Sequence, residues 1–182
     1  VSQIPARPNL NGKAPWNNQP LAYDNRDLLS AWAKLLKSSG SDTPEFRFDC
    51  VNWARQCLDN YFTELYASFR SDYKKGRVDA LRAKGARMLE ILHDVDELVG
   101  SDAYFLMGKW VEDARSWGQT AEEKDYFETD SRLLLTCWGQ KGRHLTDYAN
   151  RDWNGLIATY YLPRWEKFIA ETEESLSGGK PF

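Results

Sequence analysis

The sequence has 182 residues, which lies within the usual size of one domain and is long enough to bury a hydrophobic core. Its 42% hydrophobic and 28% charged residues are typical of a globular protein and exclude a disordered tail. The net charge of −3, without clustered Lys and Arg, excludes a nucleic-acid-binding groove, and no apolar run is long enough to span a membrane.

Residues 1–20 carry Pro, Asn and Gly with only isolated apolar residues, so we expect an extended arm or linker. No signal peptide is recognisable there, because the segment has no apolar centre. We therefore expect the chain to begin inside a longer protein, with its globular part over 21–182.

From residue 23 onward, the spacing of apolar residues predicts helices joined by short loops. They are expected over 25–37, 44–74, 78–100, 103–117, 121–138 and from 146 to about 177. Asp42 or Thr43, just before Pro44, is the predicted cap of the second helix, and a capping box from Thr120 to Glu123 is the predicted start of the fifth. Pro163 is expected to kink or restart the last helix. Because no strand pattern or repeat occurs, the predicted fold is all-α, a bundle of about six or seven helices.

No self-contained catalytic site is recognisable in the sequence. The carboxylates fall mostly in first turns, where the helix dipole explains them, or on solvated faces, so we do not expect an internal pair of catalytic acids. Glu90 and His93 have the Glu-x-x-His spacing of di-iron bundles, but the second motif that such a site needs is missing. The three cysteines have no zinc-site spacing and are interpreted as small buried thiols. We predict no metal and no cofactor.

The C-terminal third mixes rigid aromatic and hydrogen-bonding side chains around a glycine-rich break. Its members are Arg132, Thr136, Trp138, Arg143, Asp147, Tyr148, Asn150, Asn154, Arg164 and Trp165. Sugar binding uses this mixture, with an aromatic face against the ring and polar partners for the hydroxyl groups. The alternative is structural, with Trp138 capping a helix and Arg132 serving as an internal ion-pair partner. Both interpretations stay open on the residues alone.

Several segments in this order resemble the C-terminal domain of the α-N-acetylglucosaminidase family, glycoside hydrolase family 89. The main ones are Asp-Ser-Arg-Leu-Leu-Leu-Thr-Cys-Trp-Gly at 130–139, Leu-Thr-Asp-Tyr-Ala-Asn at 145–150 and Pro-Arg-Trp at 163–165. Shorter matches lie upstream at 23–25, 46–49 and 101–110. The resemblance covers about 21–182, nearly the whole predicted globular part.

The resemblance implies a parent enzyme with a small N-terminal domain, a (β/α)₈ barrel and this helical domain. Such an enzyme removes terminal α-linked N-acetylglucosamine from glycans with retention of configuration. Its two catalytic glutamates would come from the barrel, so this chain alone is expected to be inactive. The helical domain would pack on the barrel and line the active-site cleft.

Residue roles follow from the same resemblance. Trp138 is the first choice for a residue that faces the cleft, with Arg143 and His144 on the same loop. The residues expected to support the structure or the domain interface are Arg132, Asp147, Tyr148, Asn150 and Arg164.

The resemblance also implies an extracytoplasmic location, periplasmic or secreted in bacteria and lysosomal in animal relatives. Asn25-Arg26-Asp27 lacks the glycosylation pattern Asn-x-Ser/Thr, which favours a bacterial source. The alternative function is a non-catalytic helical module that binds carbohydrate or protein. A fragment of the enzyme should expose an apolar face where the barrel packs, whereas a free-standing module should expose only one modest patch.

Overall fold

The computed structural model describes residues 2–11, 21–38, 43–138, 146–179 and 182. Its α-helices are α1 (Asn25–Leu35), α2 (Pro44–Lys74), α3 (Val78–Gly100), α4 (Met107–Arg115), α5 (Ala121–Leu135) and α6 (Leu162–Gly178). A 3₁₀ turn at Ala103–Phe105 precedes α4, and a π-helical turn at Ile157–Tyr161 precedes α6. These described ranges contain helices and no strand, which confirms the predicted all-α bundle.

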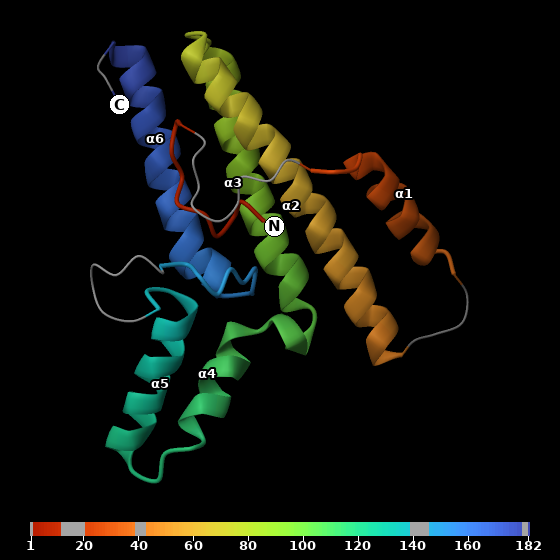
Figure 1. Cartoon of the computed structure of the whole chain (residues 1–182), viewed down its shortest axis with the longest axis vertical. Helices are drawn as coiled ribbons and strands as arrows, with labels where there is room; N and C mark the ends of the chain where they lie inside the picture. The colour runs from red at the N-terminus through yellow and green to blue at the C-terminus, as the bar shows by residue number, and fades with distance from the viewer. Residues whose placement is uncertain (1, 12–20, 39–42, 139–145, 180–181) are drawn as a thin grey trace.

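Helices α2, α3 and α6 form a central group, to which α1 and the pair α4 and α5 are attached (Figure 1). Helices α2 and α3 form an antiparallel hairpin, α6 packs against α3, and α1 lies along the outside of α2. Helices α4 and α5 form a second hairpin beyond the end of this group. None of the helices in the described ranges combines the length and the apolar character needed to cross a bilayer.

The core centres on Trp165 of α6, which is fully buried. Its ring makes edge contacts with Phe62 and Tyr66 of α2, at centroid distances of 4.8 and 4.9 Å, and with Phe168 of its own helix at 5.9 Å. Such edge-to-face arrangements are the favoured geometry of aromatic pairs. The core therefore joins α2 and α6 through aromatic side chains.

The described part of the N-terminal segment, residues 2–11, packs against this core. Ile4 is fully buried, and its carbonyl oxygen accepts a 2.8 Å hydrogen bond from Nε1 of Trp165. Farther along, the amide of Asn9 donates to the hydroxyl of Tyr66 at 2.7 Å. The interpretation of 1–20 as an arm or linker did not foresee this packing, because a single isoleucine in a polar segment has no periodicity.

The helix starts follow their predicted caps. Of the two residues predicted to cap α2, Thr43 accepts from the amide of Phe46 at 3.2 Å through its hydroxyl, and Asp42 lies outside the described residues. Both halves of the capping box between Thr120 and Glu123 are present at the start of α5. These two predictions are confirmed because capping depends on residues within one turn of the chain.

The predicted single helix over 103–117 is wrong. Leu106 is extended (φ −87°, ψ 113°) and separates the 3₁₀ turn from α4. The amide of Asn154 donates to the carbonyl of Phe105 at 2.9 Å, and the amide of Met107 donates to the carbonyl of Asn154 at 3.2 Å. Pairing with this distant segment replaces the helical hydrogen bonds at Leu106.

The last helix also starts later than predicted. Asp147 and Asn150 have left-handed backbones (φ 64° and 48°), so no helix begins at 146, and Trp153 precedes the helical part. Asp96 of α3 caps the true start, accepting from the amides of Gly155 at 2.9 Å and Ala158 at 3.1 Å. The side chain that caps this helix start belongs to another helix, and the local spacing of apolar residues does not reveal such a contact.

Two further predicted helix boundaries lie near Pro163 and Trp138. Just before Pro163 the helix widens into a π-helical turn, with the amide of Leu162 donating to the carbonyl of Ile157. The predicted kink or restart at Pro163 is confirmed. Helix α5 ends at Leu135, short of the expected residue 138, and Trp138 has a left-handed backbone (φ 51°).

Candidate functional site

Trp138 and Tyr148 meet at the C-terminal end of α5, and we call them the aromatic pair. Their ring centroids lie 5.0 Å apart with an interplanar angle of 60°. Both rings are partly open to solvent, with 36% of Trp138 and 50% of Tyr148 exposed. The amide of Trp138 donates to the carbonyl of Leu133 at 2.7 Å, which fixes the backbone where the helix ends.

Asp147 connects the aromatic pair to the core. Its amide donates to the carbonyl of Thr136 at 2.7 Å, so the backbone before Tyr148 is tied to the end of α5. Its buried carboxylate accepts from Nη1 of Arg164 at 3.0 Å and from Nε of Arg7 at 3.4 Å. The amide of Asn150 donates to the carbonyl of Asp147 at 3.1 Å. The structure therefore brings together five of the predicted support and cleft residues: Trp138, Asp147, Tyr148, Asn150 and Arg164.

Arg164 reaches both the N-terminal segment and two tyrosines. Its Nη2 donates to the carbonyl of Pro5 at 2.7 Å, and its guanidinium lies over the rings of Tyr160 and Tyr161 at 5.3 and 5.2 Å. Burial raises the pKa of Tyr160 to about 12, and the negative charge of Asp147 adds to this effect. Burial also raises the pKa of Tyr161. Both phenols are therefore neutral at physiological pH and cannot act as bases there.

Arg132 lies apart from the Asp147 contacts. Its Nε donates to Oε1 of Glu128, one turn earlier on α5, at 2.8 Å, and half of the arginine side chain is exposed. Arg115 of α4 donates to the other oxygen of Glu128 at 2.5 Å. Arg132 thus belongs to an ion-pair group between α4 and α5. Arg143 and His144 lie outside the described residues.

Sequence reasoning missed a second polar cluster in the core. Arg55 of α2 donates from Nη1 to Asp59 at 2.7 Å and to Asp152 at 3.1 Å, and both carboxyl groups are buried. Burial raises the pKa of Asp59 well above its ordinary value, with the charge of Asp152 adding to the effect, and burial also raises the pKa of Asp152. The expectation that carboxylates occupy first turns or solvated faces is wrong for these two. Only the i, i+4 spacing of Arg55 and Asp59 signals part of the cluster.

The cysteines are free thiols with different surroundings. Cys57 is buried, whereas Cys50 and Cys137 are partly exposed. The interpretation as small buried thiols therefore holds for Cys57 alone. Cys50 lies in α2 and Cys137 just after the end of α5.

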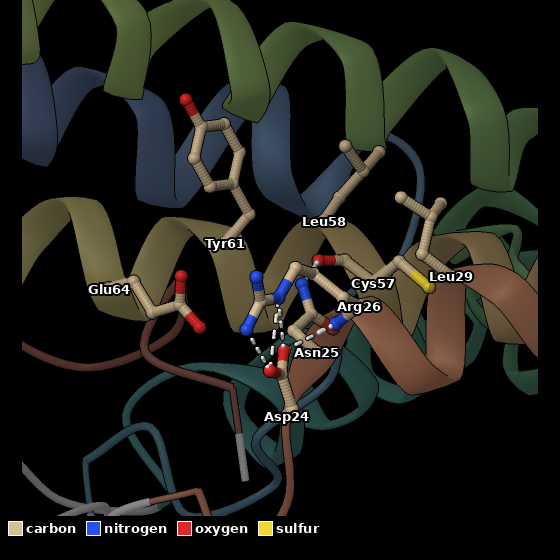
Figure 2. Close-up of a pocket in the computed structure, with 8 residues that line it drawn as sticks. All are labelled: Asp24, Asn25, Arg26, Leu29, Cys57, Leu58, Tyr61 and Glu64. Carbon is tan, nitrogen blue, oxygen red and sulfur yellow. Dashed lines mark hydrogen bonds and ion pairs between the residues drawn. The ribbon is translucent and has the colours of Figure 1, made fainter.

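A cavity of about 660 Å³ lies between α1 and α2 (Figure 2). Its lining includes Leu29, Leu58, Tyr61 and the buried Cys57, so much of it is apolar. On its rim, Asp24 and Arg26 are hydrogen-bonded, which lowers the pKa of Asp24 to about 2.

In Figure 2 the carboxylate of Glu64 points toward the guanidinium of Arg26. The guanidinium at the rim is thus already balanced by acids of the same cavity, Asp24 and Glu64. Several polar side chains of the cavity, Asp24, Asn25 and Arg26, already hydrogen-bond within the protein, which leaves fewer partners for sugar hydroxyl groups. The aromatic pair, with its accessible ring faces, is the better candidate for carbohydrate contact.

Comparison with known proteins gives a consistent result. The model of the family described as "Alpha-N-acetylglucosaminidase (NAGLU) C-terminal domain" matches residues 1–182. Human α-N-acetylglucosaminidase is 38% identical over 168 residues, which cover 91% of this chain and 22% of the human protein.

Solved structures agree with the sequence matches. A family 89 glycoside hydrolase from Clostridium perfringens, in complex with PUGNAc, superposes with a TM-score of 0.91 and 31% identity over 100% of this chain. A variant of the enzyme from that organism with two glutamates replaced by glutamine, in complex with its substrate GlcNAc-α-1,4-galactose, superposes over 98% of this chain at 0.88 and 29% identity. The chain spans about a fifth of the length of these relatives.

Proposed function

Because this chain belongs to the C-terminal domain family of α-N-acetylglucosaminidases, we propose that it is the helical domain of an enzyme that removes terminal α-linked N-acetylglucosamine from glycans. Its role is to pack on a catalytic (β/α)₈ barrel and to line one side of the active-site cleft. The half-exposed aromatic pair at the end of α5 is the observation that carries this proposal.

The catalytic glutamates belong to the barrel. A retaining glycosidase needs two carboxyl groups about 5–5.5 Å apart on either side of an accessible sugar. The close acid pair described above, Asp59 and Asp152, is buried in the core and offers no room for a sugar ring. The relatives are more than four times longer than this chain, which leaves ample sequence for a catalytic domain. The chain alone is therefore inactive.

Trp138 is the residue that contacts the sugar. Its left-handed backbone and its hydrogen bond to Leu133 hold the indole at the end of a helix, with its face partly open. A rigid aromatic face of this kind packs on the C–H groups of a pyranose at little cost in side-chain entropy. Arg143 and His144, which lie outside the described residues, are proposed as further cleft residues on the family resemblance alone.

The other predicted residues support this surface. Asp147, Asn150 and Arg164 position the turn that carries Tyr148, and Arg132 lies at the edge of the domain interface. Leu133 and Leu134 on the last turn of α5 are both more than one-third exposed, which favours a covering partner such as the barrel. The protein acts outside the cytoplasm, in the periplasm, in the medium or in a lysosome-type compartment.

Replacing Trp138 in the full-length enzyme tests the proposal. Trp138→Ala should lower kcat/KM for an α-N-acetylglucosaminide by about tenfold, the effect of losing one aromatic contact. Its melting temperature should stay close to that of the parent, because the ring is partly exposed. Trp117→Ala, at the other end of the α4–α5 hairpin, is the matched control and should keep normal kinetics.

Two results would contradict the proposal. A large loss of stability with normal kcat/KM would make Trp138 a packing residue. Turnover of an α-N-acetylglucosaminide by the 182-residue chain alone would refute the assignment of the catalytic glutamates to the barrel.

A further inference from the structure

The cluster of Arg55, Asp59 and Asp152 contains two carboxyl groups and one guanidinium group. The side chains of Asp59 and Asp152 are 1% and 4% exposed, and both accept from the same nitrogen, Nη1 of Arg55. The other oxygen of each carboxyl group, Oδ1, is buried and has no hydrogen-bond partner among the described residues. Two acceptors without donors therefore lie in one buried site.

Among the residues that the structure describes, Arg55 is the cation that contacts the pair. The remaining guanidinium nitrogens of Arg55, Nε and Nη2, donate to Oδ1 of Asn52 at 3.3 and 2.9 Å. Tyr161, from the π-helical turn, feels the charge of Asp152, and its raised pKa keeps the phenol neutral. Ser2, from the N-terminal segment, contributes a hydroxyl group, which carries no charge. If both carboxyl groups were ionised, the cluster would hold an uncompensated buried negative charge, which proteins avoid.

Ser2 adds one hydrogen-bonding group to the cluster. Its hydroxyl favours the ionised forms of Asp59 and Asp152, which opposes the effect of burial on their pKa, and its Oγ accepts from the amide of Ile4 at 3.1 Å. A single hydroxyl has one hydrogen to donate, so it cannot satisfy both carboxyl groups at once. One more donor is needed, and a proton on either carboxyl group provides it.

We infer that Asp59 and Asp152 share one proton in the folded chain, and that this protonated pair holds residues 146–155 and the N-terminal segment against α2. The three parts of the chain that meet here are α2 through Arg55 and Asp59, the segment before α6 through Asp152, and the N-terminus through Ser2. Tyr148 of the aromatic pair lies in the segment that Asp152 anchors.

The direction of the pH effect follows from proton binding. Burial raises the pKa of both carboxyl groups in the folded state, whereas in the unfolded chain aspartate titrates near pH 4. Between these values the folded chain binds more protons than the unfolded chain, so the free energy of unfolding falls as pH rises. The loss is complete once pH exceeds the raised pKa. This contribution to stability is thus fully present below about pH 4 and is lost as pH rises toward the raised pKa.

The shared proton does not depend on the proposed function; only its consequence for Tyr148 as part of a cleft rests on it. Failure of the Trp138→Ala experiment would leave the pair intact. Failure of the experiments below would leave the glycosidase assignment intact.

Asp59→Asn tests the shared proton, because an amide copies the shape and the donor of a protonated carboxyl group. In the 182-residue chain, the melting temperature should fall by about 3 °C or more between pH 5 and pH 8. In Asp59→Asn this fall should shrink to less than about 1 °C. Asp113→Asn, an exposed aspartate of α4, is the control and should keep the wild-type fall. An unchanged fall in Asp59→Asn would overturn the inference.

Two further variants and an NMR titration of the wild-type chain keep the test decisive if Asp59→Asn does not fold. Asp152→Asn should reduce the pH dependence in the same way, while the double variant Asp59→Asn with Asp152→Asn should be destabilised at every pH, because Arg55 then loses its only anion in the cluster. Carbon-13 NMR of the wild-type aspartate carboxyl groups should show a titration midpoint well above about 4. Ordinary midpoints for all aspartates would refute the shared proton.

Discussion

The central helices and the α4–α5 hairpin use aromatic residues in opposite ways. Trp165 and Phe62 in the central group are fully buried. Trp117 and Tyr126, near the tip of the hairpin, are 76% and 67% exposed. A 14% aromatic content therefore serves two purposes in one chain, a packed core and an accessible surface.

The two regions also differ in what stabilises them. The central group buries continuous apolar faces of α2, α3 and α6, so its stability comes from the hydrophobic effect. The hairpin buries little, and its contacts include ion pairs such as Arg115 with Asp125 and Glu128, together with a capping box. Such surface interactions contribute little individually. Substitutions in the two regions should therefore differ strongly in cost.

The largest effect is expected in the core. Trp165→Ala removes the ring that contacts Phe62, Tyr66 and Phe168, and should reduce the free energy of unfolding by about 3–5 kcal/mol. Urea denaturation measures this change. Trp117→Ala on the hairpin should change it by less than about 0.5 kcal/mol. Similar losses for both variants would remove the contrast between the regions.

A medium effect is expected where α3 contacts the start of the π-helical turn before α6. Asp96→Ala removes the acceptor for the amides of Gly155 and Ala158 and should cost about 2 kcal/mol. Asp94→Ala is exposed on the same helix and should be nearly neutral. Chemical denaturation of the two variants side by side checks the difference. Equal stability would show that Asp96 does not cap the start of the π-helical turn before α6.

The smallest effect is expected within the hairpin. Thr120→Ala removes the side-chain half of the capping box and should cost about 1 kcal/mol. Amide hydrogen exchange should locate the loss in the first turn of α5. Thr129→Ala, on the same helix and away from its start, should show no such local loss. Loss of protection spread evenly through α2 and α3 would contradict a local role.

The periodicity of the sequence predicted where α2 and α3 run, but it did not choose correctly between neighbouring residues. Tyr61 lies three residues after Leu58 and four before Leu65, so helical spacing places it on an apolar stripe of α2. It is nevertheless 39% exposed, whereas Phe62 beside it is fully buried. Over a helix of 31 residues, several stripes fit the apolar positions. The contact of Phe62 with Trp165 decides between them, and it joins residues far apart in the chain.

The candidate site was predictable as a set of residues and not as an arrangement. Trp138 and Tyr148 were both singled out, yet their contact depends on left-handed backbones at Trp138 and Asp147 that helical spacing does not predict. The Asp59–Asp152 cluster was missed because its bond from Arg55 to Asp152 joins residues 97 positions apart. Local rules predict caps and helices; they do not predict polar contacts made by the fold.

The contact between Ile4 and Trp165 has a consequence for the order of folding. The hydrogen bond between them joins residues 161 positions apart, almost the full length of the chain. During synthesis from the ribosome, Ile4 emerges long before α6 exists, so its place in the core stays incomplete until nearly the whole domain has been made. Helices α2 and α3 can pair early, but the core closes last, when the final helix meets the first described residues.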